Sequence, residues 1–148
     1  MIIFYSTIEK VYKLYKDLKL VDRSVKAFHS DLEQPEREAL MRDFKARRLH
    51  ILIGTDILSR GIDVEGISLV LNYDAPGDPE DYIHRIGRTA RASRAGVAIT
   101  FINDRDQQKF FRIEALMGIE VPKLPLPEGF APGPVYDPTV KPKHEGGH

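Results

Sequence analysis

Four arginines follow one another at three-residue intervals in a stretch, Tyr82 to Asn103, that contains no carboxylate. They are Arg85, Arg88, Arg91 and Arg94. Clustered guanidinium groups repel one another, and arginine is well suited to binding the oxygens of a phosphate. Because residues three apart lie on roughly one side of a helix or tight turn, the spacing predicts an anion-binding site. A solvated basic turn that pairs with acidic residues elsewhere in the chain is the alternative.

A second group of polar residues follows a short apolar run. Ile51–Ile53 reads as a strand, and Thr55 and Asp56 come soon after it. Ligands of parallel sheets bind beyond the carboxyl ends of the strands. Further on, Gly61 allows a close backbone approach or a positive φ, and Asp63 is placed to accept hydrogen bonds from a sugar hydroxyl. A helix cap at Thr55 or Asp56, with an ordinary turn at Gly61, explains the same residues.

Gln34 and Arg37 open the predicted helix Gln34–Arg47, where Pro35 suits the first turn. The free N–H groups and positive potential of a helix N-terminus suit a phosphate group. The alternative is that both side chains belong to an exposed helix face.

Short apolar runs alternate with amphipathic stretches along the chain. The predicted strands are Ile2–Tyr5, Val25–Phe28, Ile51–Ile53, Ser68–Tyr73 and Gly96–Ile102. The predicted helices are Thr7–Leu20, Gln34–Arg47, one capped by Asp78 that runs to about Ile86, and Asp104–Met117, capped by Asp104 and closed by Gly118. Continuous apolar strands separated by helices predict an α/β fold, with a mainly parallel sheet flanked by helices on both faces.

Composition narrows the classes of protein to consider. The 148 residues suffice for one domain, and 42% of them are hydrophobic, which favours a globular fold. The formal net charge is zero, so any nucleic-acid site must be local. Absence of cysteine excludes disulfides and thiolate metal sites and fits a reducing compartment. No apolar run approaches the roughly 20 residues that span a membrane.

The composition changes near residue 122. Seven of the ten prolines lie between Pro122 and Pro142, and Gly146-Gly147 follow. Such a segment lacks the apolar residues of a core, so we expect a folded domain over residues 1–121 and an extended or disordered tail over residues 122–148. At the other end, an apolar run directly follows Met1. Because natural termini usually lie at the surface, we expect the chain to be part of a longer protein.

Four segments, in order, resemble motifs of the DEAD-box ATP-dependent RNA helicases. Tyr82–Arg91 (Tyr-Ile-His-Arg-Ile-Gly-Arg-Thr-Ala-Arg) resembles motif VI, and Thr55–Asp63 resembles motif V. His29–Phe44, with its Gln-x-x-Arg set, resembles motif IVa, and Ile2–Thr7 resembles motif IV. Two positions depart from the family pattern, because Ala90 and Ser30 stand where glycine is usual. The resemblance covers Ile2 to about Met117 and implies the C-terminal RecA-like domain of such a helicase, here without its usual first strand and helix.

The resemblance also implies roles for individual residues. Arg88 and Arg91 would be arginine fingers that meet the γ-phosphate of ATP, and Gly61 and Asp63 would complete the ATP site, with Asp63 at the ribose. His84 and Arg85 would couple motif VI to the partner domain and to neighbouring motifs. The residues expected to line the RNA backbone path are Gln34, Arg37, Thr55, Asp56, Arg60 and Gly61.

No Gly-x-x-x-x-Gly-Lys-(Ser/Thr) segment and no Asp-Glu-Ala-Asp segment occur in the sequence. In the family, the groups that hold ATP with Mg²⁺ lie on the N-terminal RecA-like domain. We therefore expect RNA and that N-terminal domain as partners, a monomeric and cytoplasmic fragment, and no activity from the fragment alone. A non-enzymatic RNA-binding or adaptor module is the second hypothesis. An unrelated nucleotide-binding domain is disfavoured, because Ser6-Thr7-Ile8 stands where a Gly-rich phosphate turn would follow the first strand.

Overall fold

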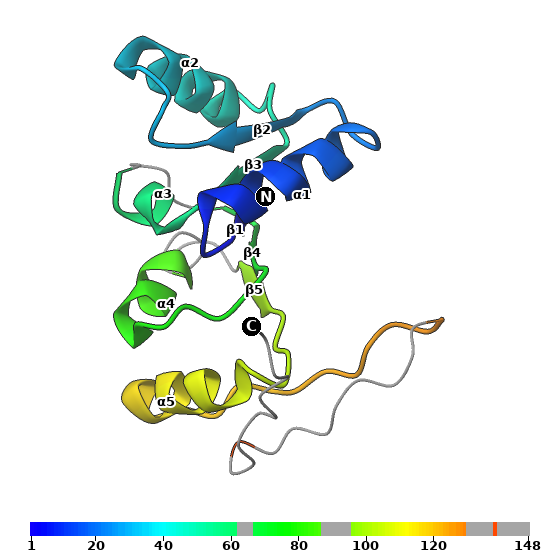
Figure 1. Ribbon diagram of the computed structural model, residues 1–148, viewed down its shortest axis with the longest axis vertical. Coiled ribbons are helices and arrows are strands. Elements are labelled where there is room, and N and C mark those ends of the chain that lie inside the picture. Colours follow the sequence, from blue (N-terminus) through cyan, green and yellow to red (C-terminus); the bar gives the residue numbers. More distant parts are fainter. Residues whose placement is uncertain (62–66, 87–95, 130–137, 139–148) are drawn as a thin grey trace, which may run out of the picture.

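The computed structural model describes residues 1–61, 67–86, 96–129 and 138, which build one parallel sheet with flanking helices (Figure 1). The strands are β1 (Ile2–Phe4), β2 (Val25–Phe28), β3 (Ile51–Gly54), β4 (Leu69–Asn72) and β5 (Val97–Thr100). The helices are α1 (Ile8–Lys19), α2 (Gln34–Lys45), α3 (Asp56–Gly61), α4 (Pro79–Ile86) and α5 (Gln107–Met117).

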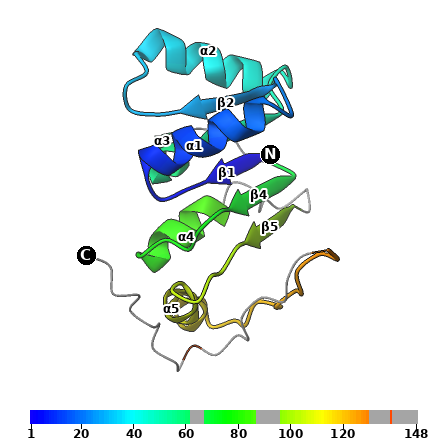
Figure 2. The same ribbon diagram turned by 45° about the vertical axis from the view of Figure 1, so that its right-hand side comes forward.

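The sheet has the strand order β2-β3-β1-β4-β5, and all its neighbours are parallel. Figure 2 shows the strands stepping from β2 at one edge to β5 at the other. In β1 every residue is buried, because a central parallel strand is covered on both faces. The predicted α/β class and the alternation of strands and helices are confirmed.

The two faces of the sheet carry separate apolar clusters. Leu40, Met41 and Phe44 of α2 pack with Phe4 and neighbouring residues on one face. On the other face, Val11 and the partly buried apolar residues of α1 pack with Ile3, Val25 and Ile53. Side chains alternate along a strand, so in β1 the side chain of Ile3 points to the face that α1 covers, and that of Phe4 points to the opposite face. Helices therefore cover both faces, as the sequence predicted (Figure 1).

Helix α1 does not reach across the whole of its face. Leu71, a neighbour of the α1 cluster, is in register with Ile99 of β5, so both point to the same side. Ile99 is 37% exposed and Val97 is 56% exposed. Tyr73 and Phe101 beyond the strand ends are exposed as well. The β5 edge therefore presents apolar side chains that nothing in the described residues covers.

Most helix ends agree with the signals in the sequence. The carboxylate of Asp78 accepts a hydrogen bond from the Glu80 amide at 2.9 Å, which confirms the cap of α4. Gly118 closes α5 with a φ of 70°, as predicted. Helix α2 ends earlier than predicted, because Arg47 adopts a positive φ of 60°.

The predicted start of α5 at Asp104 is wrong. The helix begins at Gln107, with Asp106 as its N-cap residue. The reason is a turn centred on Asn103, whose side-chain and backbone oxygens accept bonds from the Asp106 amide at 2.9 and 3.1 Å. An asparagine side chain can satisfy nearby amides in this way, and it delays the first helical turn.

Residues 119–127, which include the first residues of the predicted tail, carry no helix or strand. The Lys123 ammonium donates to Glu114 of α5 at 2.8 Å and lies over the Phe110 ring. Residues 130–137 and 139–148 lie outside the described residues, so the predicted boundary at residue 122 stays a prediction. Within the described part of the chain, no helix combines the length and the apolar character needed to cross a membrane.

Candidate functional site at the carboxyl edge of the sheet

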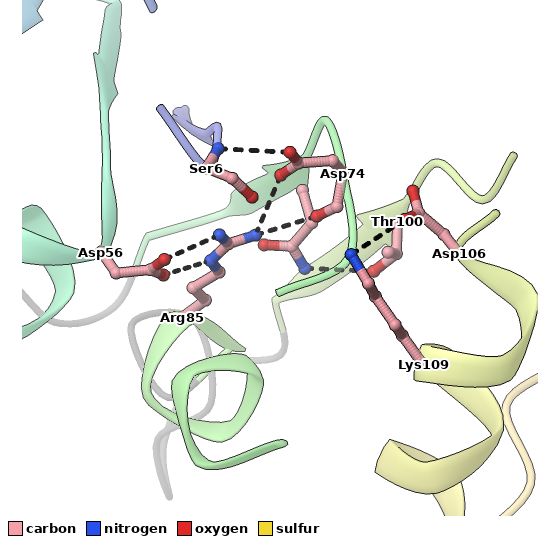
Figure 3. A network of polar contacts seen from close by, with 8 residues as sticks. Ser6, Asp56, Asp74, Arg85, Thr100, Asp106 and Lys109 are labelled. Carbon is pink, nitrogen blue, oxygen red and sulfur yellow. Dashed lines mark hydrogen bonds and ion pairs between the residues drawn. The ribbon is translucent and has the colours of Figure 1, made fainter. Parts of the chain in front are cut away.

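Polar residues from several segments meet beyond the carboxyl ends of the central strands (Figure 3). Ser6 follows β1, Asp56 follows β3, and Asp74 follows β4. Arg85 reaches this edge from α4, on the face that Phe4 also occupies. Parallel strands place all their carboxyl ends at one edge, which is why residues so far apart in sequence come together.

Arg85 is the centre of the arrangement and is completely buried. Its Nε and Nη2 atoms donate to the two carboxylate oxygens of Asp56 at 2.5 and 3.0 Å. This two-pronged geometry fits the planar guanidinium and fixes both partners in orientation. Its Nη1 atom donates to the Asp74 carbonyl at 2.9 Å, and the guanidinium lies 5.5 Å from the centroid of the Phe4 ring. The motif V segment after β3 and the motif VI helix α4 are thus joined by a buried ion pair.

Asp74 extends the connection to the segment after β1. One of its carboxylate oxygens accepts a bond from the Ser6 amide at 3.3 Å. The other, which is buried and makes no hydrogen bond, lies 3.8 Å from Arg85 Nη1. Sequence reasoning did not identify Asp74, and it named Ser6 and Phe4 only as part of the segment that resembles motif IV. The available signal was positional, because Asp74 follows a buried strand much as Asp56 follows β3.

A neighbouring polar group ties β4 to β5 (Figure 3). Asn72 is fully buried, and its amide donates to the Thr100 hydroxyl at 3.0 Å. Burial raises the pKa of the nearby Tyr82 phenol, while a hydrogen bond with Thr100 acts in the opposite direction. These contacts hold the last strand in register at the edge where the site lies.

Asp106, at the start of α5, is 6% exposed. Burial raises the pKa of its carboxyl group, and the ammonium of Lys109, 3.8 Å away, partly offsets the shift. A hydrogen bond from the Ala75 amide also favours the charged form, while the negative charge of Asp74 disfavours it. Ionisation of the Asp106 carboxyl group therefore destabilises the folded state.

The predicted RNA residues of motif IVa lie at the start of α2, which follows β2. Arg37 donates from Nε to the Leu32 carbonyl at 3.0 Å and from Nη2 to the Ser30 carbonyl at 2.9 Å. Its guanidinium also lies 5.7 Å from the centroid of the Phe28 ring. Arg37 thus holds the loop between β2 and α2. Gln34 is exposed and donates to Glu38 at 3.3 Å.

The structure places the predicted site residues unevenly. Asp56 and Arg85 are in direct contact, Thr55 precedes Asp56 at the end of β3, and His84 is exposed on α4. Arg60 and Gly61 end α3. Three predicted ATP-site residues, Asp63, Arg88 and Arg91, lie outside the described residues. The roles assigned to all of these residues remain predictions. Among the described residues there is no group of three or more acidic or histidine side chains that could hold a metal ion.

Comparisons with known proteins agree with this geometry. The helicase conserved C-terminal domain family matches residues 1–93. The ATP-dependent RNA helicase eIF4A of Scheffersomyces stipitis is 44% identical over 86% of the chain, and eukaryotic initiation factor 4A-8 of Nicotiana tabacum is 43% identical over 84%. The chain spans about a third of the length of these curated relatives, 32% and 30% respectively.

Solved structures give the same result. The C-terminal domain of the DEAD-box protein Dbp5 is 42% identical with a TM-score of 0.73, over 79% of this chain and 69% of that one. A DEAD-box protein from Methanococcus jannaschii is also 42% identical, with a TM-score of 0.72, over 80% of this chain and 33% of that one. The chain therefore belongs to the helicase conserved C-terminal domain family, as the C-terminal RecA-like domain of a DEAD-box RNA helicase.

Proposed function

We propose that this chain is the C-terminal half of an ATP-dependent RNA helicase, which completes the ATP site with arginine fingers and supplies half of the RNA backbone path. The observation that carries the proposal is the buried ion pair between Arg85 and Asp56. It joins the segment expected to contact RNA to the helix that leads into the expected arginine fingers. A rigid link between the two segments is what coupling of RNA binding to ATP hydrolysis requires.

The relatives support the same reading. The Scheffersomyces stipitis protein is named an ATP-dependent RNA helicase. A solved structure of S. cerevisiae Dbp5, 42% identical to this chain, contains RNA and ADP BeF3. Because the chain spans about a third of its curated relatives, unwinding of short RNA duplexes is proposed only for the chain joined to an N-terminal domain.

In this proposal, Arg88 and Arg91 donate hydrogen bonds to phosphate oxygens of ATP bound by the other domain. Such arginines are worth ~10³–10⁵ in kcat, or roughly 4–7 kcal/mol of barrier. Asp63 and Gly61 would approach the nucleotide, with the Asp63 carboxylate accepting bonds from the ribose. Mg²⁺ would be held by carboxylates of the N-terminal domain, since this sequence lacks the motifs that hold it.

The proposed RNA path runs along the ends of β2 and β3. Its residues would be Gln34, Arg37, Thr55, Asp56, Arg60 and Gly61. Contacts to phosphate and sugar carry little sequence information, so binding should be largely independent of RNA sequence. Closure of the two domains around ATP and RNA would bend one strand out of a duplex, and hydrolysis would allow reopening. We propose that the protein works in the cytoplasm and that this part of it is monomeric.

Steady-state phosphate release tests the proposal. The lone chain should hydrolyse no ATP, whereas the chain joined to its N-terminal domain should show RNA-stimulated hydrolysis. Arg88→Ala or Arg91→Lys should abolish most of that activity, since lysine keeps the charge but loses the planar fork. Arg112→Ala, on the exposed surface of α5, serves as the control and should leave activity unchanged. Full turnover by the Arg91→Lys protein would remove Arg91 from the catalytic role, and turnover by the lone chain would overturn the half-enzyme proposal.

The second candidate is an RNA-binding or adaptor module that retains the helicase fold without the enzymatic activity. This sequence lacks a phosphate-binding loop under either candidate. The two candidates differ in the parent protein, because only a helicase carries such a loop on its preceding domain. RNA binding without hydrolysis by the full parent protein would favour the adaptor.

A further inference from the structure

A groove of about 680 Å³ lies at the β2 edge of the sheet, away from the cluster around Arg85. We call it the edge groove and define it by Tyr12 and Tyr15 of α1, Lys26 of β2, His29 beyond β2, and Leu40 of α2. Helices α1 and α2 cover opposite faces of the sheet (Figures 1 and 2). The groove is lined by residues of both helices and of β2, so it lies at the edge between them.

The edge strand β2 has hydrogen-bonding groups that the sheet does not use. The Ser24 carbonyl accepts bonds from the His50 and Ile51 amides at 3.1 and 3.2 Å, so Ser24 faces β3. In a parallel pair, the backbone groups of alternate residues point toward the partner strand. Val25 and Ala27 therefore direct their N–H and C=O groups away from β3, into the open edge. Such an edge is a template for another strand.

The side chains around this edge form an apolar and aromatic lining. The rings of Tyr12 and His29 lie 5.1 Å apart between centroids, and Leu40 and Leu49 contribute aliphatic surface on the opposite side. The Nδ1 atom of His29 is buried and has no hydrogen-bond partner. An unpaired buried nitrogen is costly, and it can be satisfied by a bound group only if the His29 ring turns toward the groove.

The charged residues of the edge groove leave an excess of positive charge. Arg48 pairs with Asp43 at 3.1 Å. Arg23 and Lys26 then face a single remaining carboxylate, that of Glu36. A small positive excess around an apolar lining complements a peptide that mixes apolar and acidic residues. It suits RNA less well, because the lining is largely apolar and carries carboxylates of its own.

We propose that the edge groove binds an extended, acidic and apolar peptide segment of a partner protein, which adds as a strand to β2. Backbone bonds to Val25 and Ala27 supply affinity, and alternate apolar side chains of the peptide enter the aromatic lining. Carboxylates on the opposite side of the peptide meet Arg23 and Lys26. This surface lies apart from the Arg85 cluster, so the groove can serve as an anchoring point for a partner that recruits the helicase.

Amide hydrogen exchange of the 148-residue chain tests the proposal, with a capped synthetic peptide of alternating valine and glutamate as the probe. The amides of Val25 and Ala27 should exchange fast in the free chain and slow down when the peptide is added. The amides of Lys26 and Phe28, which face β3, should change little. A control peptide of alternating valine and lysine should give no protection.

Two variants distinguish strand addition from binding of the peptide to the side chains of the edge groove alone. Ala27→Pro removes an outward N–H at a position where an edge strand tolerates proline, and should weaken peptide binding by roughly tenfold or more. Lys26→Glu should weaken it roughly threefold to tenfold, since exposed charge pairs contribute modestly. Arg112→Glu makes the same change of charge on distant α5 and should leave binding unchanged. Circular dichroism checks that each variant is folded, and Lys26→Glu provides the test if Ala27→Pro is not.

Several results would overturn the proposal. Peptide binding without protection of Val25 and Ala27 would exclude strand addition. Equal binding of both peptides would exclude charge complementarity. Protection of the same amides by single-stranded RNA, in the absence of peptide binding, would assign the groove to nucleic acid.

Discussion

At the scale of single residues, the central fact is that a fully buried guanidinium is neutralised by carboxylates from two other segments. Arg85 is 0% exposed, and the side chain of its partner Asp56 is 26% exposed. A buried charge without a partner is strongly unfavourable, so these residues depend on one another. The ion pair also fixes the end of α4 relative to β3. This position matters for the proposed function, because Arg88 and Arg91 come soon after α4 in the sequence.

Replacing Arg85 with methionine should therefore destabilise the chain by roughly 3 kcal/mol or more, because it leaves Asp56 and Asp74 without their shared cation. Methionine keeps the aliphatic part of the side chain, so the loss comes from removal of the guanidinium, both as a charge and as buried volume. Urea denaturation measures the effect. Arg112→Met, at an exposed position on α5, is the control and should change stability by less than about 0.5 kcal/mol. Equal stability of the two variants would show that the buried ion pair contributes nothing to the fold.

Asp106 predicts a dependence on pH. Burial raises the pKa of its carboxyl group in the folded state. Its contribution to stability is therefore present at acidic pH and is lost as pH rises through the folded-state pKa. Asp106→Asn cannot ionise, so at pH 7 its free energy of unfolding should exceed that of the wild type. The difference should shrink as pH falls toward 3.8, the ordinary value for the group.

Denaturant titrations at several pH values check this expectation. The control is Asp17→Asn, which changes an exposed carboxylate on α1 and should not reproduce the stabilisation at neutral pH. A lower stability of Asp106→Asn at pH 7 would mean that the charged form is favoured by its contacts with Lys109 and the Ala75 amide.

At the scale of elements, the short helix α3 is positioned by its close approach to the end of β3. An added Cβ at Gly54 would lie 2.8 Å from Leu58 Cδ2 and 3.0 Å from Leu58 Cβ. The backbone oxygen of Phe28 would be 3.3 Å away. Leu58 is fully buried, so it has little room to yield. Glycine at this position lets Asp56 emerge directly from the strand toward Arg85.

Gly54→Ala should therefore cost roughly 1–3 kcal/mol, the usual range for overpacking a core. Gly77 offers a matched comparison, because nothing lies within 4 Å of an added Cβ there. Gly77→Ala should be neutral or slightly stabilising, by up to about 1 kcal/mol through the unfolded state. Thermal or urea unfolding of the two variants gives the comparison, and an equal effect at both positions would contradict the close approach.

At the scale of the whole molecule, only one side of the proposed RNA path is present. The described residues expected to contact RNA lie in the segments that follow β2 and β3, and the net charge of the chain is zero. The partner domain would supply the other side. The chain alone should therefore bind RNA weakly and with a marked dependence on salt.

Fluorescence titration of single-stranded RNA at several salt concentrations checks this expectation. Each phosphate contact should add roughly −0.7 to the slope of log K against log salt. Arg37→Ala should lower both affinity and slope, partly because Arg37 also holds the carbonyls of Ser30 and Leu32. Gln34→Ala removes an exposed side chain that does not hold these carbonyls, so a loss of RNA affinity in this variant reports the loss of an RNA contact. Tight binding that ignores salt would contradict the backbone path.

The fold class and the order of elements could be predicted from the pattern of apolar residues. Runs such as Ile2–Phe4 and Ile51–Gly54 are apolar on both faces, which only central parallel strands require. Local signals also located helix ends where a side chain acts on its own neighbours, as at Asp78 and Gly118. The predicted start of α5 was wrong because the turn that begins at Asn103 competes with the helix for the same backbone amides. Composition does not indicate which of the two structures forms.

The partners of Arg85 were decided only by the tertiary structure. Its position in motif VI indicated a functional arginine, yet Asp56 and Asp74 lie 29 and 11 residues away. The strand order β2-β3-β1-β4-β5 brings the ends of β3 and β4 to either side of β1, and α4 packs against β4 and against α3, which follows β3. The same order leaves β2 at an edge and so creates the edge groove. Sequence periodicity records which residues are buried, whereas the neighbours of a buried charge depend on the order in which distant strands pair.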